Sequence, residues 1–196
     1  MPPSPPVPPL PDPPPALGLL STFLLQAEDA LTSWDRYDAE YTDLDGRPYD
    51  QETYGAKQFE RDFAIWRSFL STHEAAELLD VAEASVAALS VGSAQPRWTW
   101  QLGRLQDALE EIETASADLD KRMAADPYMS GEDHYEAIAG FCLEVSNALS
   151  DWVTHGRAVL EIHAATVRAG QSGIRLAARA PHAFAPALPA PARRNR

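Results

Sequence analysis

A carboxylate-rich segment, residues 41–52 (YTDLDGRPYDQE), has the residue types and part of the spacing of a calcium-binding loop. In the helix-loop-helix calcium site, carboxylates stand at loop positions 1, 3 and 5, a glycine at position 6 makes the turn, and a glutamate at position 12 binds bidentately. With Gly46 at position 6, Asp43, Asp45 and Glu52 fall at positions 3, 5 and 12. These three acidic residues are therefore the candidate metal ligands.

The same segment departs from the calcium loop in ways that favour a simple turn. Position 1 is Tyr41 rather than a carboxylate, position 8 is Pro48 rather than an aliphatic residue, and the chain has no second copy of the loop. Asp45-Gly46 and Arg47-Pro48 are dipeptides typical of turns. We therefore favour a connector between two helices, and a calcium titration distinguishes the two interpretations.

The region around this segment mixes acidic and aromatic residues in a pattern that suits a basic partner. Residues 28–54 contain nine acidic and two basic residues, interleaved with five Trp and Tyr residues. Carboxylates attract a basic protein surface from a distance, which makes binding fast and salt-sensitive. The alternative is a solvated helix face whose aromatic residues enter the core. The candidate partner-binding residues are Trp34, Tyr37, Asp38, Tyr41, Asp43, Asp45, Tyr49 and Asp50.

Other catalytic and metal signatures are missing or weak. The chain has no glycine-flanked serine, no phosphate-binding loop and no dinucleotide fingerprint. Two i, i+4 pairs, His73 with Glu77 and Asp151 with His155, are interpreted as paired surface charges, because a di-iron bundle needs repeated Glu-x-x-His pairs. The single cysteine, Cys142, excludes an internal disulfide and is expected to be inert packing. We therefore predict no cofactor and no enzymatic activity.

Composition and charge limit the remaining classes of function. The 196 residues are 45% hydrophobic, enough for one core, and carry a formal net charge of −13. Every acidic residue lies within 12–161, whereas 162–196 holds six arginines and no acid, so only this basic tail should attract nucleic acid. The longest apolar run, residues 17–25, is too short to cross a bilayer, and the N-terminus lacks the basic start of a secretory signal. We therefore expect no membrane partner and a cytoplasmic location; fourteen arginines against two lysines suit a GC-rich bacterial genome.

Both ends of the chain lack a pattern that could bury a face. Residues 1–16 contain ten of the seventeen prolines, which predicts an extended polyproline II arm. Its Pro-x-x-Pro steps could dock in an aromatic groove, but we interpret the arm as a spacer. Residues 170–196, rich in alanine, proline and arginine, are expected to be disordered. The predicted helical domain spans residues 17–169.

Between the tails, the apolar residues follow helical spacing and predict an all-α fold, a bundle of five helices. The first helix is expected over 17–43 and the second over 52–70. A capping box, Ser71 with Glu74, predicts the start of a third helix that ends near Val91. The predicted core stripe of the first helix is Leu17, Leu20, Leu24, Ala27, Leu31, Trp34 and Tyr41, and that of the second is Phe59, Phe63, Trp66 and Leu70.

The strongest pattern lies in the last two helices, which are expected to form a long antiparallel hairpin resembling a coiled coil. On both sides of the loop ADPYMSGED, apolar residues recur in steps of four and three. Folding about residue 129 places Trp98 over Gly156 and Ser116 opposite Cys142, so we predict that Gly156 makes room for the Trp98 indole. The predicted seams are Trp98, Leu102, Leu105, Leu109, Ile112, Ser116, Leu119 and Met123, facing Tyr135, Ile138, Cys142, Val145, Leu149, Trp152, Gly156, Val159 and His163.

These features favour a non-enzymatic protein of interaction or assembly: an adaptor, an inhibitor or a structural component with an acidic binding surface. The expected partner is a protein with a basic surface, and a second copy of the chain is the expected partner if a heptad helix has a further apolar face. One alternative is a ligand- or metal-binding helical bundle, including a cryptic enzyme. The other is an acidic mimic of nucleic acid that inhibits a basic enzyme.

Overall fold

A computed structural model describes residues 14–72, 74–89 and 94–179, with side chains described as far as residue 171. This part of the chain is helical and contains no β-strand, which confirms the all-α prediction. The elements are α1 (Pro15–Tyr41), α2 (Gln51–Phe69), a 3-10 turn η1 (Leu70–Thr72), α3 (Ala75–Ala88), α4 (Pro96–Ala125), α5 (Gly131–His155) and α6 (Arg157–Arg179). Most of the predicted proline arm and basic tail lies outside the described residues. Within them, α1 begins at Pro15 and α6 continues to Arg179, past both predicted domain boundaries.

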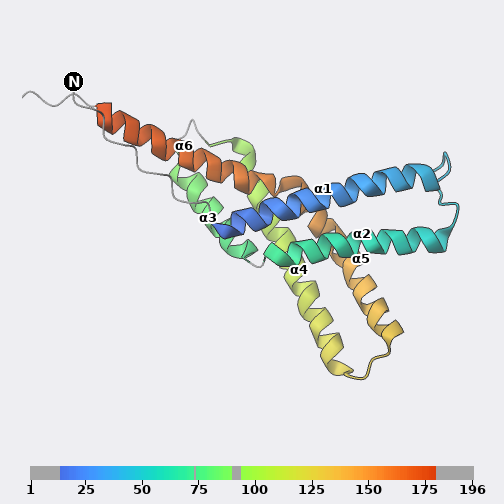
Figure 1. Cartoon of the computed structure of the whole chain (residues 1–196). Helices are drawn as coiled ribbons and strands as arrows, with labels where there is room; N and C mark the ends of the chain where they lie inside the picture. The colour runs from blue at the N-terminus through green and yellow to red at the C-terminus, as the bar shows by residue number, and fades with distance from the viewer. Residues whose placement is uncertain (1–13, 73, 90–93, 180–196) are drawn as a thin grey trace, which may run out of the picture.

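The helices form two hairpins that meet a third helical pair (Figure 1). The antiparallel helices α1 and α2 make one hairpin, whose closed end projects to one side. The helices α4 and α5 make the second, whose closed end projects at a steep angle to the first. The pair α3 and α6 packs against the start of α1 and against α4, on the side opposite the closed end of α1–α2. The molecule therefore has three projections around one centre.

The core lies where the helices cross. Its most deeply buried large side chains are Trp98, Trp152, Phe23, Leu20, Leu79, Leu105, Ile162 and Val145, which come from every helix except α2. Helix α2 adds only Ile65 and Phe69. The predicted core stripe of the second helix is correct only in part: Phe59, Phe63 and Trp66 are half-buried and pack against the core, whereas Leu70 is exposed. Leu70 lies in the 3-10 turn after α2, where the helical period no longer applies.

Aromatic pairs connect α2 to α5. Phe59 lies 4.7 Å from Tyr135 and Trp66 lies 4.9 Å from Phe141, measured between ring centroids. At the inner end, the Phe69 ring is 5.2 Å from that of Trp152, and it also contacts Phe23 of α1 at 5.3 Å. These tilted and edge-to-face arrangements are the favourable ones for aromatic rings. The two hairpins are thus joined along the second half of α2.

Polar side chains of α4 contact residues of both α5 and α6. Arg97 pairs with Glu161 at 2.7 Å, and the Trp98 indole N–H donates to the same carboxylate at 3.1 Å. Arg104 pairs with Asp151. The seam from Trp98 to Ile112 is buried, whereas Leu119 and Met123 near the loop are half-buried, because the closed end projects away from the other helices. The Ser116–Cys142 layer stays a prediction.

The boundary between α2 and α3 lies at the predicted place but is made differently. The Ser71 hydroxyl donates to the Ser68 carbonyl, and the Thr72 hydroxyl donates to the Phe69 carbonyl, both at 2.6 Å. The residue before α3 is Glu74, whose side chain makes no capping hydrogen bond. The predicted capping box was therefore wrong, since these hydroxyls satisfy the end of α2 instead of the start of α3. The third helix ends at Ala88, and Val91, near which its end was predicted, lies outside the described residues.

The last predicted helix is divided into α5 and α6 at Gly156, and a close contact explains why this residue is a glycine. A Cβ atom built there would lie 2.6 Å from the Trp152 carbonyl oxygen and 3.1 Å from Leu24 Cδ2. The nearest atoms belong to α1 and to the preceding turn, and not to Trp98, so the predicted reason was wrong. Gly156 instead lets α1 cross close to the junction of α5 and α6.

We predict opposite effects of alanine at two glycines of this region. Gly156→Ala should lower the free energy of unfolding by about 1–3 kcal/mol, because the added methyl overpacks the contact with Trp152 and Leu24. Gly140→Ala in α5 should raise it by up to about 1 kcal/mol, because a Cβ there meets no atom within 4 Å and alanine favours the helix. Urea denaturation followed by circular dichroism measures both. Equal effects at the two sites would contradict the proposed crossing.

Candidate partner-binding surface

A turn fixed by Asp43 closes the hairpin of α1 and α2. The Asp43 carboxylate accepts hydrogen bonds from the backbone N–H groups of Asp45 and Arg47, both at 2.9 Å through Oδ1. The Gly46 N–H donates to the Asp43 carbonyl at 3.0 Å, and Gly46 has a φ of 74°, in the left-handed region that favours glycine. The side chain of Asp43 therefore organises the turn as in an Asx turn.

A second aspartate, Asp50, starts α2. Its carboxylate accepts from the backbone N–H groups of Glu52 at 3.1 Å and Thr53 at 3.4 Å, and from the Thr53 hydroxyl. The hydrogen bond from the Thr53 hydroxyl, followed by that from its backbone, lowers the pKa of Asp50. A carboxylate at this place satisfies free N–H groups and suits the positive end of the helix dipole. The turn is thus held by side-chain caps on both sides.

An aromatic cluster holds the two helices together behind the turn. Its members are Trp34, Tyr37 and Tyr41 of α1 and Tyr54 of α2. The rings of Tyr37 and Tyr41 stack with centroids 4.3 Å apart, and Trp34 lies edge-on to Tyr54 at 5.0 Å. The guanidinium carbon of Arg61 lies 4.4 Å from the centroid of the Trp34 ring, a cation–π geometry. None of the four aromatic residues belongs to the main core, so the end of the hairpin has its own packing.

A hydrogen bond between Tyr54 and Asp38 crosses the same interface. The Tyr54 hydroxyl donates to Asp38 Oδ1 at 2.5 Å in a partly buried position. This hydrogen bond, together with burial and the negative charge of Asp38, raises the pKa of Tyr54 above its ordinary value. Asp38 is a polar residue between Trp34 and Tyr41 of the predicted stripe of α1, and this hydrogen bond gives it a structural role.

The structure brings the predicted partner-binding residues to the end of one hairpin, but it divides them into two groups. Trp34, Tyr37, Asp38 and Asp43 are half-buried and support the fold of the hairpin. The exposed predicted residues are Tyr41, Asp45, Tyr49 and Asp50.

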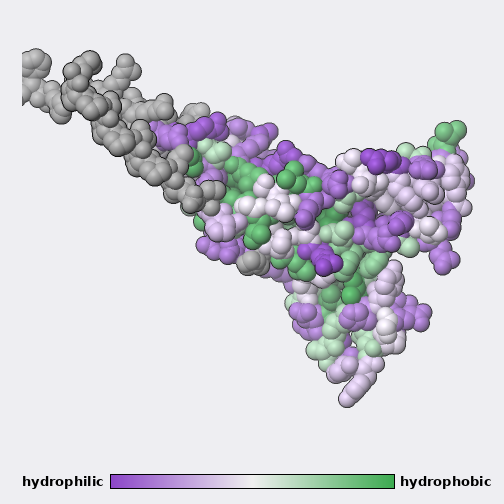
Figure 2. Space-filling model, in the orientation of Figure 1, coloured by the Kyte–Doolittle hydropathy of each residue, from purple (hydrophilic) through white to green (hydrophobic). Residues whose placement is uncertain are grey.

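The most exposed apolar side chain at this end was not predicted. Leu44 is fully exposed in the turn, and Tyr49 is 71% exposed. Figure 2 shows hydrophobic atoms at the closed end of the α1–α2 hairpin beside hydrophilic ones. One feature of the sequence could have predicted this exposure. Leu44 lies between Asp43 and Asp45, in a turn and not on a helix face that could be buried. We call Tyr41, Leu44, Asp45, Tyr49 and Asp50 the hairpin-end surface.

The predicted metal ligands do not assemble into a cation site in this structure. In the described part of the chain, no group of three or more His, Cys, Asp or Glu side chains is placed to hold a metal ion. Asp43 is occupied by the backbone of the turn, and Glu52 follows the cap of α2. Of the two i, i+4 pairs, Asp151 lies 4.0 Å from His155 and also pairs with Arg104, whereas His73 lies outside the described residues. The thiol of Cys142 is buried, and desolvation raises its pKa to about 11.

We predict that Tyr54 ionises above the ordinary tyrosine pKa of 10.0. Because the pKa of folded Tyr54 is raised above its usual 10.0, the hydrogen bond stabilises the fold below that pH and its contribution is lost as pH rises through the raised pKa. Asp38→Asn should lower this pKa, seen as earlier ionisation in an ultraviolet titration. Tyr54→Phe should remove the late step and lower the free energy of unfolding by about 1 kcal/mol at neutral pH.

Tyr128 is 95% exposed, and Tyr128→Phe is the matched control. It should leave both the free energy of unfolding and the late ionisation step unchanged. If Asp38→Asn leaves the titration curve as it is in the unmodified protein, the assigned role of Asp38 is wrong.

The described helices and the chain as a whole were each compared with known patterns. Among the helices that the structure describes, none is long and apolar enough to cross a membrane. No family model, no curated protein and no solved structure matches the chain.

Proposed function

We propose that this chain is a non-enzymatic adaptor that binds a basic protein segment through the hairpin-end surface. The observation that carries the proposal is the exposure of Leu44 and Tyr49 on a turn that two aspartates hold in place. Exposed large apolar side chains with a polar rim are typical of interaction sites. The surrounding charge supports a basic partner, since residues 28–54 contain nine acidic and two basic residues.

The two kinds of residue serve different parts of the binding reaction. Carboxylates such as Asp45 and Asp50 accelerate encounter with a basic surface and disfavour acidic competitors. Leu44 and Tyr49 supply apolar area that leaves water on binding, which gives most of the affinity. Because the hydrogen bonds of Asp43 already order the turn, binding loses little conformational entropy.

The proposal extends to finer features of the molecule. We infer a bundle whose α4–α5 hairpin packs as a coiled coil, and a cytoplasmic location in a bacterium. The hairpin of α1 and α2 then presents its closed end at a distance from the core, as an adaptor requires. A second copy of the chain is the further partner that the heptad pattern suggests.

We predict that a double substitution at the hairpin end removes the partner. Leu44→Ala with Tyr49→Ala should reduce capture of basic proteins from a bacterial lysate at least tenfold, because both apolar contacts are lost. Quantitative mass spectrometry of material retained by the immobilised full chain measures the change. Asp45→Asn should weaken capture mainly at low salt, because exposed charges are screened at high salt.

Leu25→Ala with Tyr128→Ala is the matched control, because Leu25 and Tyr128 are also exposed, at 63% and 95%, and lie away from the hairpin end. This control should retain the same proteins as the unmodified chain. Equal capture by the two double variants contradicts the proposal, as does a set of captured proteins that is not basic.

A further inference from the structure

A groove between α1, α2 and α5 lies apart from the hairpin-end surface. Its cavity has a volume of about 270 Å³. Its polar lining comes from Arg61, Asp62, Ser146, Asn147 and Ser150. Its apolar lining comes from Leu31, Ile65, Leu149 and Val153. The groove therefore combines two opposite charges, small polar groups and aliphatic surface.

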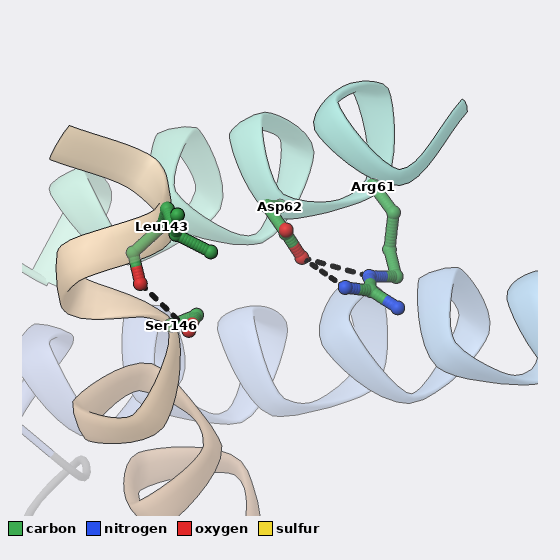
Figure 3. Close-up of polar contacts among 4 residues, drawn as sticks. All are labelled: Arg61, Asp62, Leu143 and Ser146. Carbon is green, nitrogen blue, oxygen red and sulfur yellow. Dashed lines mark hydrogen bonds and ion pairs between the residues drawn. The ribbon is translucent and has the colours of Figure 1, made fainter. Parts of the chain in front are cut away.

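The two charges belong to neighbouring residues of α2 that turn toward the same space (Figure 3). Arg61 donates to Asp62 Oδ1 through Nε at 2.8 Å, and its Nη2 lies 2.6 Å from the same oxygen. Side chains next to each other in a helix ordinarily point in different directions. Here both point from α2 toward the space that α1 and α5 border, and they are only 19% and 12% exposed.

Each residue of this ion pair has one polar group that neither contact uses. Both contacts end on Asp62 Oδ1, and Oδ2 takes part in neither (Figure 3). The Nη1 group of Arg61 also takes part in neither, and stacking on Trp34 uses the face of the guanidinium but not its edge. The pair thus offers the groove an acceptor and a donor of opposite charge.

Burial makes the carboxylate in particular receptive to a further cation. Desolvation raises the pKa of Asp62, although the hydrogen bond from Arg61 acts in the opposite direction. A carboxylate whose charge is only partly compensated gains from an added positive group. Ser146 lines the groove and donates its hydroxyl hydrogen to the Leu143 carbonyl at 2.9 Å, so its oxygen remains available as an acceptor.

The arrangement selects a ligand by charge and by size. An ion pair is a dipole, and a ligand with one charge would leave the other partner unmatched, whereas a zwitterion matches both. The cavity volume of about 270 Å³ is sufficient for a free amino acid. The four aliphatic side chains favour an aliphatic side chain on the ligand.

We propose that this groove binds a free α-amino acid with an aliphatic side chain. The ligand ammonium lies on Asp62 Oδ2 and the Ser146 hydroxyl, its carboxylate lies on Arg61, and its side chain packs on Ile65 and Val153. No residue of the hairpin-end surface takes part, so the site is independent of the adaptor function.

Isothermal titration calorimetry on the full chain tests the site with leucine, glycine, leucinamide and N-acetyl-leucine as probes. Leucine should bind at least tenfold tighter than each of the others, because glycine lacks the side chain and the two derivatives each lack one charge. Asp62→Asn and Arg61→Lys should each weaken leucine binding at least tenfold. Asp80→Asn and Arg67→Lys, at exposed positions of α3 and α2, are the matched controls and should bind leucine unchanged.

A third variant separates binding from folding, because Arg61 also contacts Trp34. Ser150 is exposed and lines the groove, so Ser150→Leu should fill the groove, keep the melting temperature and abolish leucine binding. The proposal is overturned if leucine shows no saturable binding, if Ser150→Leu or Asp62→Asn binds it as the unmodified protein does, or if leucinamide binds as tightly as leucine.

Discussion

The aromatic contacts between α2 and α5 are the interaction on which the arrangement of the two hairpins depends. Phe59, Trp66 and Phe69 each meet an aromatic residue of α5, along the second half of α2. Each such pair contributes about 0.5–1.5 kcal/mol beyond the burial of its area. Phe69, Phe141 and Trp152 belong to the buried core, so these contacts anchor the second half of α2 to it. They also set the separation of α2 from α5, and with it the groove that Asp62 lines.

The crossing of α1 at Gly156 divides that helix into two parts with different surroundings. The residues from Ala16 to Ala27 enter the core beside α3 and α6, whereas the second half of the helix lies mainly beside α2, with Leu31 also bordering the groove that α5 lines. An exposed two-helix hairpin cannot be held by a large core, and here the aromatic cluster and the caps of Asp43 and Asp50 hold it instead. Because water surrounds this part of the chain, many carboxylates can be placed there with little mutual repulsion. The acidic character of the hairpin end thus follows from its position.

The success of the sequence-based predictions depended on how many partners each helix has. In α4 and α5 one face is buried, so steps of four and three identified Leu105, Val145 and Trp152 as core residues. In α2, Phe59 and Trp66 contact aromatic residues of α5, whereas Ile65 and Phe69 are buried in the core. Because apolar residues therefore occur on more than one face of this helix, a single helical stripe did not identify its buried residues. The role of Gly156 depends on Leu24 of α1, which spacing within a hairpin cannot reveal. The turn residues 43–50 were predictable because their hydrogen bonds are local, whereas the pairs Tyr54–Asp38 and Arg61–Trp34 join residues far apart in sequence.

Arg61 belongs both to the aromatic cluster and to the groove. Its guanidinium presents a face to Trp34 and an edge to Asp62, and a planar group can make both contacts at once. An ammonium group in place of the guanidinium has no such plane, so lysine would have to give up one of the two. A ligand in the groove that holds Arg61 in its present position would also favour the contact with Trp34. Because such coupling acts in both directions, packing of the hairpin end and occupancy of the groove would support each other through this one side chain.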